Sequence, residues 1–141
     1  MIVVHHSDSA RDNVETIRRF HTSSEREFND IGYHYVILNG NGGTDGEVKT
    51  GRDEEAVGAH AKTEGRNFNS VGICLVGKET FTDKQKSALV RKLAELCRKY
   101  NITPSAETIV PHHATCPGTG INLTEIIDRV KTSGENSNPK P

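Results

Sequence analysis

The sequence is poor in large apolar residues. Its 141 residues include no tryptophan and one methionine, aromatic residues make up 5%, and mean hydropathy is -0.62. No apolar run approaches the ~20 residues that a membrane-spanning helix needs, which excludes such a helix. The N-terminal stretch Met1–His6 lacks the basic and long apolar regions of a secretory signal. We therefore expect synthesis in the cytoplasm without a signal peptide.

An excess of charge and a disulfide framework are also lacking. The chain has 18 Lys and Arg against 19 Asp and Glu, a net charge of -1, which argues against nucleic-acid binding dominated by phosphate contacts. Its three cysteines are too few and too irregularly spaced for a disulfide scaffold and suit a reducing compartment. Cys74 and Cys97 fall within apolar patterns, so we expect both to be buried. Cys116 lies between a histidine pair and Pro-Gly, which marks it for chemistry.

The apolar pattern predicts one α/β domain, a central mixed β-sheet flanked by helices. Apolar residues at helical spacing follow a capping box of Thr82 and Gln85, and a similar pair, Asp12 and Glu15, precedes an earlier helix. Residues 132–141 are small, polar and Pro-containing, so we expect a domain over 1–131 and a disordered tail over 132–141. The expected strands cover 2–4, 33–38, 47–50, 70–76 and 109–110, and the expected helices cover 13–22, 82–100 and 123–130.

Two histidine doublets each follow a short β-branched run. His5-His6 follows the run 2–4, and His112-His113 follows the run 109–110. Neighbouring residues on a strand point to opposite faces, so at most one histidine of each doublet can serve a given site. Two imidazoles and the thiolate of Cys116 would form a three-ligand site with one position open, which suits catalytic zinc.

The same residues allow a second enzymatic interpretation. Cys116 could act as a nucleophile with His112 or His113 as its base, and this chemistry needs no metal. Both interpretations require the same side chains to lie close together, so spacing alone does not separate them.

Short blocks in order along the chain resemble the zinc-dependent N-acetylmuramoyl-L-alanine amidase family, which includes T7-type phage endolysins and the peptidoglycan recognition proteins. The resemblance extends from Ile2 to about Val130. It rests on the segments Val4-His5-His6-Ser7, Asn29-Asp30-Ile31-Gly32-Tyr33-His34-Tyr35, Gly51-Arg52, Ala59-His60, Asn69-Ser70-Val71-Gly72-Ile73 and His112…Cys116-Pro117-Gly118.

The resemblance implies roles for individual residues. The family's zinc ligands fall on His5, His112 and Cys116, and its catalytic tyrosine falls on Tyr33. Such a phenol can donate a hydrogen bond to an oxyanion if it reaches the metal cleft. Positions at which relatives contact muropeptide fall on two further residues, which we expect to bind substrate: His60 and Asn67. His34 is expected to be structural and His21 to lie on the surface.

The chain departs from the family just before Cys116. Many relatives carry a Lys or Thr two positions before the cysteine, where it assists catalysis, whereas this chain has Ala114. Thr115 is one residue away from that position, and His113 is the alternative helper.

The resemblance therefore implies a peptidoglycan hydrolase, a phage or prophage endolysin that cleaves the amide between N-acetylmuramic acid and L-alanine with Zn²⁺. Its expected partner is peptidoglycan, reached in the periplasm after another protein permeabilises the membrane, and the protein is expected to be a monomer. A non-catalytic peptidoglycan-binding module and a metal-free Cys-His hydrolase remain the alternatives.

Overall fold

The computed structural model describes residues 1–24, 30–61, 67 and 69–137. The described residues form one α/β domain of three helices and one five-stranded sheet, as the apolar pattern predicted. In chain order the elements are β1 (Ile2–His6), α1 (Val14–His21), β2 (Tyr35–Ile37), β3 (Val48–Thr50), β4 (Val71–Leu75), α2 (Asp83–Lys99), β5 (Ile109–Pro111) and α3 (Leu123–Ser137).

The sheet is mixed, with strand order β3-β2-β4-β1-β5. Strands β2, β4, β1 and β5 run parallel to one another. The edge strand β3 pairs antiparallel with β2. Parallel strands are usually covered on both faces, which explains why β1 and β4 read as nearly continuous apolar runs. The carboxyl ends of β1, β4 and β5 consequently meet at one edge of the sheet, the usual place for a site in this fold class.

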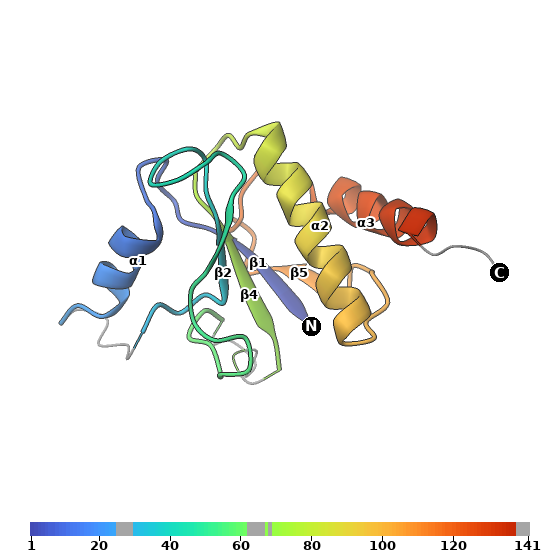
Figure 1. Ribbon diagram of the computed structural model, residues 1–141, viewed down its shortest axis with the longest axis horizontal. Helices are drawn as coiled ribbons and strands as arrows, with labels where there is room; N and C mark the ends of the chain where they lie inside the picture. The colour runs from blue at the N-terminus through green and yellow to red at the C-terminus, as the bar shows by residue number, and fades with distance from the viewer. Residues whose placement is uncertain (25–29, 62–66, 68, 138–141) are drawn as a thin grey trace.

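Helices cover the two faces of the sheet unequally. Figure 1 shows α2 and α3 together on one side and α1 on the other. The larger core, which includes Ile2, Val4 and Ile73, lies on the α2–α3 side. Side chains alternate along β1, so His5 lies on the opposite face from Ile2 and Val4. The α2–α3 face thus holds most of the core, while the α1 face carries the first histidine of the chain's first doublet.

The ends of two helices differ from the sequence prediction. The capping box of α1 consists of Asn13 and Thr16, one residue later than the predicted pair Asp12 and Glu15. Both pairs offer suitable side chains, and in the structure the side chains of Asn13 and Thr16 each accept a hydrogen bond from the other's backbone N–H. The predicted box of Thr82 and Gln85 at α2 is confirmed.

Helix α3 is longer than its apolar stripe predicted. It continues to Ser137, so the prediction that the chain is without structure from residue 132 is wrong for 132–137. The apolar stripe ends at Val130, but backbone hydrogen bonds can continue a helix beyond its last apolar residue. Proline ends a helix, and the next proline in the sequence is Pro139. Residues 138–141 of the expected tail lie outside the described residues. Among the described helices, none combines the length and the apolarity needed to cross a membrane.

Candidate metal and catalytic site

Three side chains that the sequence singled out converge at the carboxyl edge of the sheet. One ligand atom each of His5, His112 and Cys116 lies within 4.8 Å of the other two. His5 is on β1 and His112 directly follows β5, so the parallel pairing of these strands sets the two imidazoles side by side, with ring centroids 4.6 Å apart. Only one histidine of each doublet joins this group, as strand alternation predicted.

A short turn brings Cys116 back to the two histidines. The backbone N–H of His113 donates to the Cys116 carbonyl and the N–H of Cys116 donates to the His113 carbonyl, both at 3.1 Å. The Cys116 sulfur accepts a hydrogen bond from the backbone N–H of His6 at 3.4 Å. These bonds fix the sulfur beside the strand end that carries His5.

Burial controls the protonation of this group. Desolvation, followed by the neighbouring His60, holds the pKa of His5 well below its usual value, so His5 is neutral at pH 7. Burial also raises the pKa of the Cys116 thiol, although its hydrogen bond from His6 opposes this. A neutral imidazole retains a lone pair for a cation, and the thiol must lose its proton to act either as a zinc ligand or as a nucleophile.

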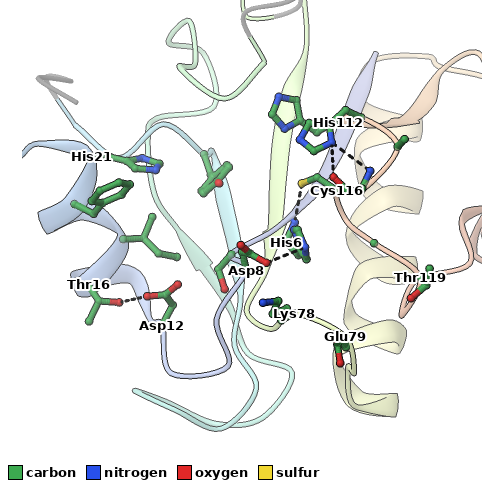
Figure 2. Close-up of a pocket in the computed structure, with 18 residues that line it drawn as sticks. His6, Asp8, Asp12, Thr16, His21, Lys78, Glu79, His112, Cys116 and Thr119 are labelled. Atoms are coloured by element: carbon green, nitrogen blue, oxygen red, sulfur yellow. Dashed lines mark hydrogen bonds and ion pairs between the residues drawn. The ribbon is translucent and has the colours of Figure 1, made fainter. Parts of the chain in front are cut away.

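A cavity of about 670 Å³ opens beside these residues. Figure 2 shows His112 and Cys116 at one side of the cavity and His21 across from them, with Asp8 and Asp12 between. Its lining comes from the loop after β1, helix α1, Tyr33, the loop after β4 and the turn 112–119. His5 is 1% exposed and does not line the cavity, so the cation site lies in the cavity wall.

Tyr33 lines the same cavity. Its ring centroid lies 5.0 Å from that of His5. A hydrogen bond from the Tyr33 side chain also reaches the thiol of Cys74, whose pKa burial raises. Cys74 pairs in register with His5, so the phenol lies over the strand pair that carries the candidate ligand. Its oxyanion role stays a prediction.

His21 is a residue whose place the sequence analysis got wrong. It is buried, at 9% exposed, and does not lie on the surface. Its Nδ1 accepts a 2.8 Å hydrogen bond from the backbone N–H of Gly32, and its ring centroid lies 5.3 Å from that of Tyr33. His21 thus fixes the backbone at Gly32 and packs against Tyr33, the next residue. The spacing of Val14, Ile17 and His21 on one helix face could have indicated this burial.

The two possible helper residues contact each other. His113 Nδ1 lies 3.1 Å from the Thr115 hydroxyl and 3.2 Å from the Thr115 backbone nitrogen. Both side chains line the cavity and both residues belong to the turn that carries Cys116. The structure therefore places them as a pair, and their roles remain a proposal.

The structure does not bring the predicted substrate-binding residues to the cavity. His60 is 7% exposed and lies behind His5, with His60 Nδ1 2.9 Å from His5 Nε2. The Asn67 side-chain oxygen accepts hydrogen bonds from the backbone N–H groups of His60 and Ala61, at 2.8 and 2.7 Å. Neither is among the residues that line the cavity, so their positions favour support of the site over contact with substrate. His34, at 0% exposed, is buried as a structural residue would be.

Comparison with known proteins identifies relatives of this arrangement. Residues 1–119 match the family model described as N-acetylmuramoyl-L-alanine amidase. An endolysin from Enterobacteria phage K11 is 41% identical over 112 residues, which cover 74% of this chain and 66% of the endolysin. An endolysin from Escherichia phage T7 is 38% identical over the same shares. The match thus spans slightly less than two thirds of these curated relatives.

Solved structures agree in fold. The N-acetylmuramoyl-L-alanine amidase LysC from Clostridium intestinale superposes with a TM-score of 0.79 at 32% identity, covering 93% of this chain and 84% of that chain. Drosophila PGRP-LB superposes with a TM-score of 0.68 at 31% identity, covering 89% and 77%. Since the family model covers most of the chain and the fold agrees, the chain belongs to the N-acetylmuramoyl-L-alanine amidase family.

Proposed function

We propose that this chain is a zinc-dependent peptidoglycan hydrolase that cleaves the amide between N-acetylmuramic acid and L-alanine. The observation that carries the proposal is the convergence of His5, His112 and Cys116 within 4.8 Å, beside a cavity that Tyr33 also lines. Support comes from the endolysins and amidases that the chain resembles, and from a neighbour at 30% identity, a mutant of Drosophila PGRP-LB solved in complex with tracheal cytotoxin.

The donor set fits zinc. Two imidazole nitrogens and one sulfur are ligands that zinc prefers, and three protein ligands leave a fourth position for water or substrate, as in catalytic zinc sites. Hard cations such as Mg²⁺ and Ca²⁺ prefer oxygen ligands, which this group lacks. His5 and Cys116 are 1% and 5% exposed, so the protein holds them in place before any cation binds. Bound zinc supplies Lewis-acid activation of water and of the substrate carbonyl.

The chain's own residues supply the remaining chemistry. We assign to Tyr33, which lines the cavity, a hydrogen bond from its hydroxyl to the oxyanion that develops on the scissile carbonyl. Amide cleavage also requires a proton at the leaving nitrogen. His113 and Thr115 line the cavity beside Cys116, so we assign proton delivery to His113 and a hydrogen bond to the intermediate to Thr115. The cavity itself holds the muropeptide next to these groups.

The alternatives are less well supported. A metal-free cysteine nucleophile needs one histidine as its base, whereas two imidazoles converge with the Cys116 sulfur. A non-catalytic binding module requires none of the three converging ligands, yet all three are present. We further propose that residues 1–131 form the catalytic domain, that the protein is a monomer and that it acts at the bacterial cell wall.

Loss of turbidity of purified peptidoglycan, with and without a chelator, tests the proposal. We expect clearing, release of new L-alanine amino termini, inhibition by the chelator and recovery on adding Zn²⁺. Cys116→Ser separates the two enzymatic mechanisms, because a hydroxyl is a poor zinc ligand but a possible nucleophile. Loss of both zinc and activity in Cys116→Ser supports the proposal. Full activity of the parent protein in chelator would instead favour the cysteine nucleophile.

A further inference from the structure

A chain of three polar side chains runs from the candidate cation site into the protein. His5 Nε2 lies 2.9 Å from His60 Nδ1, and His60 Nε2 lies 3.2 Å from the Ser70 hydroxyl oxygen. His5 and His60 are 1% and 7% exposed, so water does not compete freely for these contacts. The two imidazole rings meet edge to face, at 84°, which aims a ring nitrogen of one at the other.

Only two proton arrangements satisfy this chain when both imidazoles are neutral. A neutral imidazole carries one N–H donor and one acceptor nitrogen. Either His5 Nε2–H donates to His60 and His60 Nε2–H donates to Ser70, or both hydrogen bonds run in the opposite direction. In the second arrangement His5 Nδ1 carries the proton and has no lone pair for a cation. Cation binding by His5 therefore requires the first arrangement.

We propose that His60 is a positioning residue that accepts the Nε2–H of His5 and thereby directs the lone pair of His5 Nδ1 at His112 and Cys116. This inference rests on the proposed zinc site. A ligating histidine commonly donates its other N–H to a carboxylate, a carbonyl or water, and that partner fixes both tautomer and ring orientation. Here the imidazole of His60 is that partner. Its own Nε2–H then donates to the Ser70 hydroxyl.

The surrounding chain is built to hold the His60 ring in this position. The Asn67 oxygen ties down the backbone N–H groups of His60 and Ala61 on one side. On the other side the ring packs on Gly72 of β4, where a Cβ would lie only 2.5 Å from the ring. A side chain at position 72 would thus displace His60. The positions of Asn67 and Gly72 have a common explanation in the placing of this imidazole.

Zinc affinity of matched variants tests the proposal without reference to activity. The Asn side-chain oxygen can occupy the position of His Nδ1, so His60→Asn keeps an acceptor for His5, whereas His60→Leu keeps volume and removes the acceptor. We expect His60→Leu to raise the Kd for Zn²⁺ by about 10–100-fold, and His60→Asn to change it by less than about 5-fold. Equal affinities in the two variants would overturn the proposal.

Two controls guard against a general effect on folding. His21→Leu replaces another buried histidine that bonds a backbone N–H and is not part of the cation group, so we expect its Kd for Zn²⁺ to stay at the parent value. If His60→Leu fails to fold, His60→Gln replaces it, because the Gln amide reaches towards Ser70 instead of His5. We then expect His60→Gln to bind zinc more weakly than His60→Asn, and the reverse order overturns the proposal.

Long-range ¹H–¹⁵N NMR of histidine reads the proton positions directly. In the zinc-loaded protein we expect His5 bound through Nδ1 with its proton on Nε2, and His60 with its proton on Nε2. Binding of His5 through Nε2, or a proton on His60 Nδ1, would overturn the inference. If the protein binds no zinc, the proposed function fails, and the metal-free protein still tests the pair. There we expect the His5 Nε2–H form to predominate and to lose population in His60→Leu, and equal populations in both proteins would overturn the pair's role.

Discussion

The Tyr33 hydroxyl is a single atom whose removal tests the oxyanion assignment. Tyr33→Phe keeps the ring that packs near His5 and His21 but removes the hydrogen-bond donor. We expect kcat on peptidoglycan to fall by about 10²–10³, the usual cost of losing a transition-state donor. Zinc content and Tm should stay close to those of the parent protein. A fully active Tyr33→Phe enzyme would make Tyr33 a packing residue only.

The side chains of His113 and Thr115 are hydrogen-bonded to each other, so the effects of their substitutions on kcat should not be additive. We expect His113→Ala and Thr115→Val each to lower kcat by about 10²-fold, the lower end of the range of acid–base assistance. Since either change disrupts the 3.1 Å contact, the double variant should cost little more than the more damaging single change. Initial rates of the four proteins under one condition measure this coupling. Additive losses would show two independent roles, and parental rates in all variants would show that this chain dispenses with a helper.

The residues around the site show what sequence patterns can and cannot supply. Strand alternation and the family blocks selected His5, His112 and Cys116, and the structure brings these three together. Exposure was less predictable. His21 and His60 are both buried, because burial depends on which segments pack over a residue, and neighbours in sequence say little about that.

Gln85 connects the start of α2 to the ends of two strands. It is fully buried, its oxygen accepts from the Thr82 backbone N–H, and its amide donates to the carbonyls of Ile37 and Val76. Gln85→Leu would remove the bond from the Thr82 N–H and leave the buried Val76 carbonyl without its side-chain donor, while the Ile37 carbonyl keeps its bond from the Val76 N–H. We expect a loss of about 2–4 kcal/mol in the free energy of unfolding. Urea unfolding measures it, with Lys84→Ala, an exposed change on the same turn, as a control expected within about 0.5 kcal/mol.

A cost below about 1 kcal/mol for Gln85→Leu would show that water or a backbone shift satisfies the Val76 carbonyl. The control matters here, because alanine favours a helix at least as much as lysine does, so a loss of similar size in Lys84→Ala would show that any change in this turn is costly.

Glu54 joins the loop after β3 to the end of α2. It accepts hydrogen bonds from Lys99, Tyr100 and Tyr35. Partial burial raises the pKa of Glu54, but these three donors outweigh it and lower the pKa to about 2. A carboxyl whose folded-state pKa lies below its unfolded value stabilises the fold above the unfolded pKa. That contribution is lost as the pH falls towards 2.

Glu54→Gln should therefore destabilise the protein in a pH-dependent way. We expect a loss of about 1–2 kcal/mol at pH 7, allowing for solvent screening of a partly exposed group, and a smaller difference from the parent at about pH 3–4. Thermal unfolding at several pH values measures the difference. Glu55→Gln makes the same charge change at the next, exposed residue and should leave stability nearly unchanged throughout. A pH-independent difference for Glu54→Gln would mean that the carboxylate charge does not matter.

The elements were more predictable than their ends. Strand positions followed from β-branched runs, because buried parallel strands need apolar residues on both faces. Helix α3 extends to Ser137, beyond the last residue of its apolar stripe, because backbone hydrogen bonds can continue where side-chain packing stops. The cap of α1 lies one residue later than predicted because two overlapping pairs could both cap the helix, and the sequence alone does not decide between them.

At the scale of the whole molecule, the cation site and the main core are separate structures. The main core lies between the sheet and the α2–α3 layer, whereas His5 lies on the other face. The three candidate ligands sit on strand ends and on a turn whose backbone hydrogen bonds do not depend on a cation. The metal-free protein should therefore fold, and zinc should add stability to a fold that already exists.

Chelation measures that addition. A ligand that binds only the folded state stabilises it by RT ln(1 + [L]/Kd), about 2.7 kcal/mol when free zinc is 100 times its Kd. For a domain of this size we expect Tm to fall by several degrees in chelator. Excess Zn²⁺ should restore Tm, and Mg²⁺ should not, because nitrogen and sulfur ligands select against a hard cation. The Cys116→Ser variant should show little response to either chelator or zinc. A parent protein whose Tm is the same in chelator and in excess zinc does not bind the metal in its folded state, and the proposed mechanism would then fail at its first step.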